Sequence, residues 1–470
     1  MGRPRVRLLA AAGLVLVGLI APGTPAGADP TTAVVGSPSG GDPYFPAAGN
    51  GGYQVRHYDL SLRYTPASRS LTGRARIEVT TRREDLRSFS LDLRDLTVSS
   101  VRVDGRPADF RQEGPELVVT PGHVLRARQR FTVDVRYGGT TGQPTDATGA
   151  LYGWVSHPDG AFVANEPDGA STWFPVNDAP YDKATYAFRI RVPEGTVAVA
   201  NGDLLGTRTR AGWTTSRWSA EEPMASYLAM AASGNYVLTA SRTADGLPIV
   251  NAVDADLSPT DQAETAEVLA RQPEMIAYFA GLFGPYPFGS FGAVVDDDED
   301  ADYALENQTR PIYSGPPSEG TVAHELAHQW YGDSVTPERW RDIWLNEGFA
   351  TYAEWLWTEH RGGASVQEQF DTAYARPATS AFWQVEVGDP GAARLFDAAI
   401  YDRGAMALQA LRTRVGDDAF FRVLRAWAQR HRYGVVSTDD LVRVAERVSG
   451  QPLDDLFTTW LHAPGKPSRP

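Results

Sequence analysis

The chain has 470 residues, of which 42% are hydrophobic and 22% charged, so it is long enough to form more than one packed core. It contains no cysteine, which excludes disulfides and thiolate metal ligands, so a bound metal would have to be held by histidine and carboxylate side chains. The formal net charge of −14 disfavours nucleic acid as a partner.

Residues 1–28 have the features of a secretory signal peptide. An arginine-rich start precedes an apolar run from Leu8 to Ile20, and Ala26 and Ala28 form an AxA-like cleavage pattern. The apolar run is shorter than the ~20 residues that a membrane-spanning helix needs, and no later segment approaches that length. The sequence therefore predicts a secreted, extracellular protein without a membrane span.

A β-rich domain is predicted for residues 53–240. The preceding residues, 29–52, are rich in glycine and proline and are interpreted as a flexible N-terminal segment. Short alternating runs such as Leu60, Leu62 and Tyr64 then recur, which is typical of half-buried strands. The dipeptides Asp104–Gly105 and Asn201–Gly202 favour type I′ hairpin turns. The pattern indicates an antiparallel β domain.

A mainly helical domain is predicted for residues 241–470, where the hydrophobic period lengthens. Ser258 is expected to cap a helix that has Pro259 in its first turn. Further helices are expected at about residues 318–331, 343–361 and 402–415, with a last one near the end of the chain. The predicted fold class is α+β, with a β-rich N-terminal domain followed by a mainly helical one.

An HExxH motif, His324 to His328, lies in one of these predicted helices. Histidines four residues apart lie on one face of a helix, so both imidazoles can reach one cation. Glu325 projects beside that cation and can act as a general base towards water. The motif predicts a zinc site with a hydrolytic function.

A catalytic zinc site needs a third protein ligand, and Glu347 is the candidate. Eighteen residues separate it from His328, and it stands at the start of the next predicted helix. If this helix folds back, two histidines and one glutamate would hold one Zn²⁺ per chain and leave a position for water.

This spacing resembles that of the aminopeptidase N family of gluzincins, HExxH followed by eighteen residues and Glu. The resemblance covers about residues 55–463 and implies a short, secreted two-domain form with a thermolysin-like catalytic domain. Residues 304–307, Ala-Leu-Glu-Asn, are similar to the family's GxMEN exopeptidase motif. Tyr303 stands where the family usually has Gly, and Leu305 where it usually has Met.

The resemblance implies roles for residues outside the zinc site. Glu166, in the segment before Phe174–Pro175, and Glu306 correspond to carboxylates that bind the substrate α-amine. Ala304 and Asn307 belong to the same substrate-binding motif. Tyr401, in a YxKG-like segment where Arg403 replaces the usual Lys, corresponds to the tyrosine that stabilises the oxyanion. The implied activity is removal of N-terminal residues from peptides that have a free amine.

Two alternatives stay open at this point. One is an endopeptidase or another hydrolase on the same scaffold, because the family includes an epoxide hydrolase and Tyr303 departs from the motif. The other is a non-catalytic peptide-binding protein, which would be expected to have lost a ligand or the base. None of His324, Glu325, His328 and Glu347 is lost.

Overall fold

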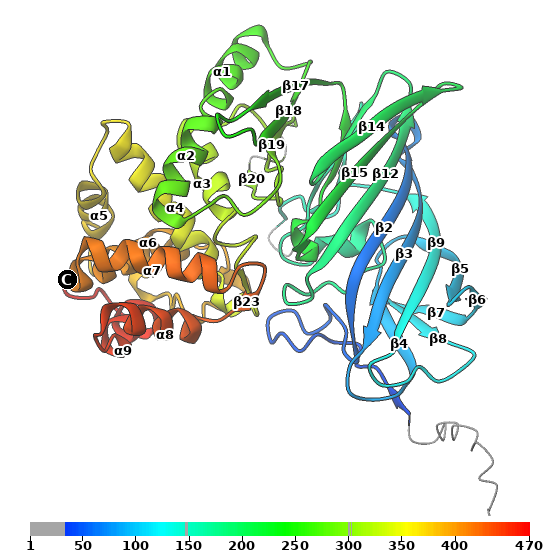
Figure 1. The fold of residues 1–470 in the computed structure, drawn as a ribbon, viewed down its shortest axis with the longest axis horizontal. Helices are drawn as coiled ribbons and strands as arrows, with labels where there is room; N and C mark the ends of the chain where they lie inside the picture. The colour runs from blue at the N-terminus through cyan, green and yellow to red at the C-terminus, as the bar shows by residue number, and fades with distance from the viewer. Residues whose placement is uncertain (1–32, 146–148, 299–300, 302) are drawn as a thin grey trace, which may run out of the picture.

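The computed structural model describes residues 33–145, 149–298, 301 and 303–470 (Figure 1). The predicted signal peptide, residues 1–28, lies outside the described residues. Within them, no helix is both long and apolar enough to cross a bilayer. Figure 1 shows a β-rich N-terminal domain on one side and a largely helical domain on the other, as the sequence predicts.

The N-terminal domain is built on a twisted eight-stranded sheet. Side chains alternate along its strands: in β2, Tyr58, Leu60 and Leu62 are buried, whereas Asp59 and Arg63 are exposed on the opposite face. All strand pairs in the sheet are antiparallel except β12 with β2. The strands, in spatial order, are β14 (Asp203–Arg210), β15 (Trp213–Met224), β12 (Ala184–Pro193), β2 (Tyr53–Thr65), β3 (Ser70–Thr81), β9 (Arg130–Thr140), β5 (Thr97–Val103) and β6 (Arg106–Pro107).

Two four-stranded sheets complete this domain and share its aromatic core, where the rings of Tyr64 and Trp154 have centroids 5.0 Å apart. The second of the two sheets leads directly into the segment that carries Glu166. The first sheet contains β1 (Val34–Val35), β4 (Leu86–Asp92), β8 (Glu116–Thr120) and β7 (Asp109–Glu113), and the second contains β10 (Gly153–Ser156), β11 (Ala161–Ala164), β16 (Ala231–Gly234) and β13 (Val197–Ala200).

The second domain begins with a five-stranded sheet before its helices. The strands in order are β17 (Tyr236–Arg242), β18 (Pro248–Asp254), β19 (Phe291–Val295), β21 (Ile312–Tyr313) and β20 (Ala304–Leu305). Because β17 spans the predicted boundary at residue 240 and pairs with β18, we propose that the boundary lies before Tyr236. A small parallel pair, β22 (Thr336–Pro337) and β23 (Val435–Val436), ties the loop after the HExxH helix to a later segment.

The expected helices form close to their predicted positions. Ser258 caps the first, because its Oγ accepts a hydrogen bond from Asp261 N at 3.2 Å. The helices are α1 (Pro259–Leu269), α2 (Gln272–Phe283), α3 (Glu319–His328), α4 (Trp344–His360), α5 (Val366–Tyr374), α6 (Ala398–Val415), α7 (Asp417–Arg430), α8 (Thr438–Ser449) and α9 (Asp454–Phe457), followed by a π-helical turn at Thr458–His462.

The hairpin prediction is right for Asp104–Gly105 and wrong for Asn201–Gly202. Asp104 and Gly105 have φ of 49° and 75° and connect the antiparallel pair β5 and β6. By contrast, β13 and β14, on either side of Asn201–Gly202, belong to different sheets, and only Gly202 of the two has a positive φ. The Asn201 side chain instead donates to Gln308 O at 2.7 Å and so fixes a loop of the second domain.

Residues 33–52, part of the segment that the sequence predicts to be flexible, contact both domains in the structure. Val34 pairs with Leu86 in the N-terminal domain, and Asp42 Oδ2 accepts a hydrogen bond from Trp340 N of the second domain at 2.9 Å. Glycine here permits close packing: a Cβ on Gly36 would lie 2.8 Å from a backbone oxygen. The segment therefore links the two domains.

Candidate active site

The two histidines of the HExxH motif lie one turn apart on α3. This helix begins where Ser318 Oγ accepts a hydrogen bond from Thr321 N at 3.0 Å. The imidazole centroids of His324 and His328 are 4.8 Å apart. His328 Nδ1 lies 3.1 Å from the carbonyl oxygen of Tyr331 and donates to it, which orients Nε2 towards the site.

Helix α4 brings Glu347 to these histidines. Its Oε2 lies 3.2 Å from His324 Nε2 and 3.6 Å from His328 Nε2. One ligand atom from each of the three residues lies within 4.8 Å of the others. Burial by itself raises the pKa of Glu347, but His328 and His324 outweigh it and lower the pKa to about 2. Two nitrogens and an ionised oxygen at this spacing fit the donor set of zinc.

Close backbone contact between helices fixes the position of Glu347. A Cβ on Gly348 of α4 would lie 2.9 Å from the backbone of Gly404 in α6, so only glycine allows this approach. The same contact holds α6, and therefore Tyr401, beside the site. Gly332 has a positive φ of 131°, and a Cβ on Gly332 would lie 3.1 Å from His328 Nδ1.

Glu325 lies on the same helix as the two histidines but does not belong to the triad. It is buried, and a carboxylate oxygen of Glu325 lies within 4.8 Å of ligand atoms of Glu306 and His328. Burial raises the pKa of Glu325 to about 7, against the opposing effect of the two histidines. A carboxylate with a pKa near neutrality suits a group that both accepts and returns a proton.

Glu166 and Glu306 lie beside Glu347, which brings together residues from both domains. One oxygen from each of the three lies within 4.8 Å of the others. Oε1 of Glu166 and Oε1 of Glu306 are buried without a hydrogen-bond partner among the described residues. Burial and then the charge of Glu306 raise the pKa of Glu166, and burial raises that of Glu306. Unsatisfied buried carboxylates are costly, so this carboxylate cluster favours a cationic group that would pair with it.

The segment that carries Glu306 is the edge of the five-stranded sheet. Ala304 lies on the edge strand β20, and the side chain of Asn307 is buried with neither polar atom hydrogen-bonded to a described residue. Gln329, the residue after α3, donates from Nε2 to Glu306 O at 3.2 Å and accepts from Thr309 N at 2.7 Å. The loop that carries Glu306 is therefore hydrogen-bonded directly to the residue that follows the HExxH helix.

The two residues that depart from the exopeptidase motif make contacts of their own next to Glu306. The hydroxyl of Tyr303 donates to Leu151 O of the N-terminal domain at 2.7 Å. Leu305 is buried and pairs with Ile312 across β20 and β21. Tyr303 therefore adds a contact between the domains.

Tyr401 lies next to the triad of His324, His328 and Glu347, near the start of α6. Its ring is nearly parallel to that of His324, with centroids 6.1 Å apart. Burial raises the pKa of its hydroxyl well above the ordinary value, and Glu347 adds to this. The hydroxyl is therefore a hydrogen-bond donor at neutral pH.

Sequence reasoning missed several residues that position this site. Lys183 is buried and donates from Nζ to Asp333 O at 2.6 Å and to Thr336 Oγ1 at 2.8 Å, which ties the N-terminal domain to the loop after α3. Arg403 is fully buried and donates to backbone carbonyls of residues 383, 385, 459, 460 and 463. For Lys183 the only signal was the rarity of lysine, since it is one of two in the chain, whereas Arg403 stood out as a departure in the YxKG-like segment without revealing these contacts.

Comparison with known proteins agrees with this architecture. The family model described as the peptidase M1 N-terminal domain matches residues 54–228, and the peptidase family M1 domain matches residues 300–460. Aminopeptidase M1 from Arabidopsis thaliana is 27% identical over 457 residues, covering 88% of this chain and 50% of its own length. Aminopeptidase N from Lactobacillus delbrueckii subsp. lactis is 28% identical, covering 87% of this chain and 51% of its own length. The chain thus spans about half the length of these curated relatives.

Solved structures of similar length match more completely. An M1 zinc metallopeptidase from Deinococcus radiodurans superposes with a TM-score of 0.83 at 29% identity, covering 92% of this chain and 98% of its own. A mutant of a two-domain M1 zinc metallopeptidase bound to L-tryptophan has a TM-score of 0.84 at 29% identity, covering 92% of this chain and 99% of its own. Because both domain models match in the order found here and the structural likeness spans both domains, the chain belongs to peptidase family M1.

Proposed function

We propose that this protein is a zinc-dependent aminopeptidase that removes the N-terminal residue from peptides with a free α-amine. The observation that carries the proposal is the pair of unsatisfied buried oxygens, Oε1 of Glu166 and Oε1 of Glu306, next to Glu347. A substrate ammonium group would satisfy both. A blocked N-terminus would leave them desolvated and unpaired, so the amine would act both as an anchor and as a specificity filter.

His324, His328 and Glu347 would hold one zinc ion per chain. When bound, zinc supplies Lewis-acid chemistry, lowering the pKa of water and polarising a carbonyl oxygen. Glu325 would take a proton from the attacking water and pass it to the leaving amine, a role that its burial beside the histidines supports. Tyr401 would donate a hydrogen bond to the carbonyl oxygen as negative charge develops on it.

The test compares one peptide with a free N-terminus and the same peptide N-acetylated, with and without a zinc chelator. The proposal predicts turnover of the free peptide, little turnover of the acetylated one, and loss of activity with chelator. Equal turnover of both peptides would instead favour an endopeptidase on this scaffold. Turnover that resists exhaustive chelation would contradict the zinc mechanism.

Export of the protein is also proposed, and it rests on the sequence of residues 1–28 alone. N-terminal sequencing of protein recovered from the culture medium tests it. Cleavage after Ala28 is the expected result, and retention of the intact N-terminus inside the cell would contradict it.

A further inference from the structure

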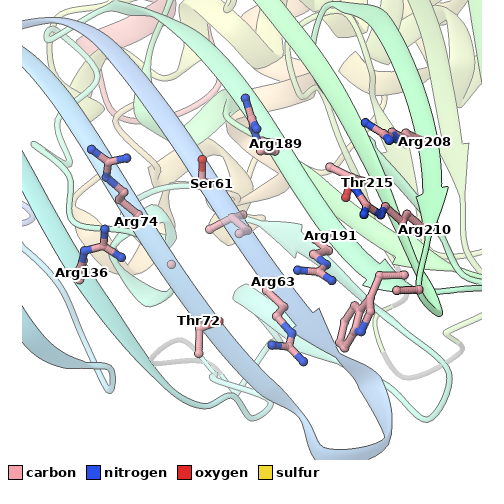
Figure 2. A pocket seen from close by; sticks show the side chains of 14 residues that line it. Ser61, Arg63, Thr72, Arg74, Arg136, Arg189, Arg191, Arg208, Arg210 and Thr215 are labelled. Atoms are coloured by element: carbon pink, nitrogen blue, oxygen red, sulfur yellow. The ribbon is translucent and has the colours of Figure 1, made fainter.

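The outer face of the eight-stranded sheet carries a group of seven arginines far from the zinc ligands in the chain. Figure 2 shows this group, which we call the arginine face, lining a hollow of about 620 Å³. No aspartate or glutamate lines the hollow. The seven arginines, all exposed, are Arg63, Arg74, Arg136, Arg189, Arg191, Arg208 and Arg210.

Strand register places these arginines in rows that cross the sheet. One row runs over five strands, from β15 to β9, as Arg217, Arg189, Ser61, Arg74 and Arg136. Strands lie about 4.8 Å apart, so this row spans on the order of 20 Å.

A second row lies beside the first. It contains Arg208, Thr215, Arg191, Arg63 and Thr72 on strands β14 to β3. Neither row contains a carboxylate.

The register also sets like charges against each other. Arg74 lies directly opposite Arg136, and Arg189 lies directly opposite Arg217, in antiparallel pairs. Like charges directly opposite in a sheet are destabilising. The whole chain has a net charge of −14, so the charge of the arginine face is opposite in sign to that of the chain.

Carboxylates on neighbouring positions do not neutralise this charge. Among the described residues, only Arg74 of the seven forms an ion pair, with Asp134. Arg63 and Arg191 instead lie over the ring of Trp213, 4.0 and 4.9 Å from its centroid. These contacts orient the two guanidinium groups but leave their charges unbalanced.

We propose that the arginine face binds a linear polyanion that carries tetrahedral oxyanions, phosphate or sulfate, along its length. Guanidinium groups bind such oxyanions through paired hydrogen bonds, and rows of arginines at regular spacing match a chain of repeated charges. Binding would also relieve the repulsion between the paired arginines. The site would lie on the N-terminal domain and act independently of peptide hydrolysis.

Other anionic partners fit this face less well. A flat bilayer surface would not enter a hollow. Single-stranded nucleic acid is usually held by aromatic stacking, and the one aromatic residue that lines the hollow, Trp213, already packs against two arginines. An acidic peptide could add as a strand only beside the edge strand β14, because the backbone groups of β15, β12, β2, β3 and β9 are already paired on both sides, so strand addition would not reach most of the face.

The test measures binding of long-chain inorganic polyphosphate and of heparin to the full-length protein over a series of salt concentrations. The variant replaces three arginines of the face, Arg136→Gln, Arg189→Gln and Arg191→Gln. The matched control removes the same charge at exposed arginines elsewhere, Arg106→Gln, Arg394→Gln and Arg447→Gln. Thermal unfolding checks that both variants fold, and the face variant is expected to unfold at or above the wild-type temperature because repulsion is removed.

The proposal predicts that the face variant binds at least about tenfold more weakly and with a shallower salt dependence, whereas the control binds like wild type. Preference for polyphosphate over heparin would identify phosphate as the natural group, and the reverse would identify sulfate. Three outcomes would overturn the proposal. The first is absence of binding to both polymers at physiological ionic strength, and the second is an equal loss of binding affinity in the control. The third is tighter binding of single-stranded DNA, anionic phosphatidylserine vesicles or polyglutamate than of either polymer. Peptidase activity is expected to be unchanged in both variants.

Discussion

The triad of His324, His328 and Glu347 and the carboxylate cluster of Glu166, Glu306 and Glu347 share Glu347 but differ in how they are built. The triad comes from two successive helices of one domain, and Oε2 of Glu347 lies within 3.6 Å of Nε2 of both imidazoles. The carboxylate cluster joins Glu166 of the N-terminal domain to Glu306 of the second domain, and each leaves a buried oxygen without a hydrogen-bond partner among the described residues. We propose that the triad holds a metal, whereas a cationic group of the substrate completes the carboxylate cluster. Variants that separate these two regions test the account.

The largest effect is expected for Glu325→Gln, which removes the proposed general base and leaves the triad and the carboxylate cluster in place. The side-chain amide of glutamine cannot accept a proton from the attacking water. We therefore expect kcat to fall by about 10²- to 10⁴-fold with zinc content unchanged. Steady-state kinetics and elemental analysis measure both quantities. Glu359→Gln, at an exposed acid of α4, is the control and should behave like wild type. Full activity of Glu325→Gln would remove it from the mechanism.

Tyr401→Phe removes one hydrogen-bond donor beside the triad. The expected loss is about 10²- to 10³-fold in kcat, with little change in KM or in zinc content. A rise in KM with unchanged kcat would show instead that Tyr401 acts in ground-state binding.

Glu306→Ala removes one carboxylate of the cluster and leaves the triad intact. We expect kcat/KM for a free-amine peptide to fall by about 10- to 100-fold, while the same value for the acetylated peptide changes little, so discrimination weakens. The exposed Glu267→Ala on α1 is the control. If zinc is lost along with discrimination, the two regions are not separable as proposed.

Gly348→Ala probes the packing that holds the triad and Tyr401 together. The added Cβ would lie 2.9 Å from the backbone of Gly404, so α4 and α6 must move apart. Overpacking of this kind typically costs about 1–3 kcal/mol of unfolding free energy. Denaturant unfolding measures it, and Gly281→Ala, where a Cβ would meet nothing within 4 Å, is the matched control. Unchanged stability of Gly348→Ala would mean that the helix contact is looser than the structure describes.

The comparison also explains what could be predicted from the sequence. The triad depends on helical periodicity and on one loop between helices, so the spacing of His324, His328 and Glu347 was enough to predict it. The domain classes followed from the change in hydrophobic period. Glu166 and Glu306 were reached only through family resemblance, because no local pattern reveals that residues 140 positions apart meet at a domain interface.

Other features could not be predicted for similar reasons. Asn201–Gly202 has the sequence of a hairpin turn, but tertiary hydrogen bonds from the Asn201 side chain decide its conformation. Glycines before residue 52 suggested flexibility, whereas in the fold they allow close contact. Helix packing at Gly348 and Gly404 depends on three-dimensional approach and leaves no periodic signal.

The most direct test of the central claim is the zinc content of purified wild-type protein and of the Glu347→Ala and Glu325→Gln variants, measured by elemental analysis after dialysis. The account predicts about one zinc per chain for wild type and Glu325→Gln, and loss of zinc from Glu347→Ala. Wild-type protein without stoichiometric zinc, or Glu347→Ala that retains zinc with undiminished affinity, would contradict it.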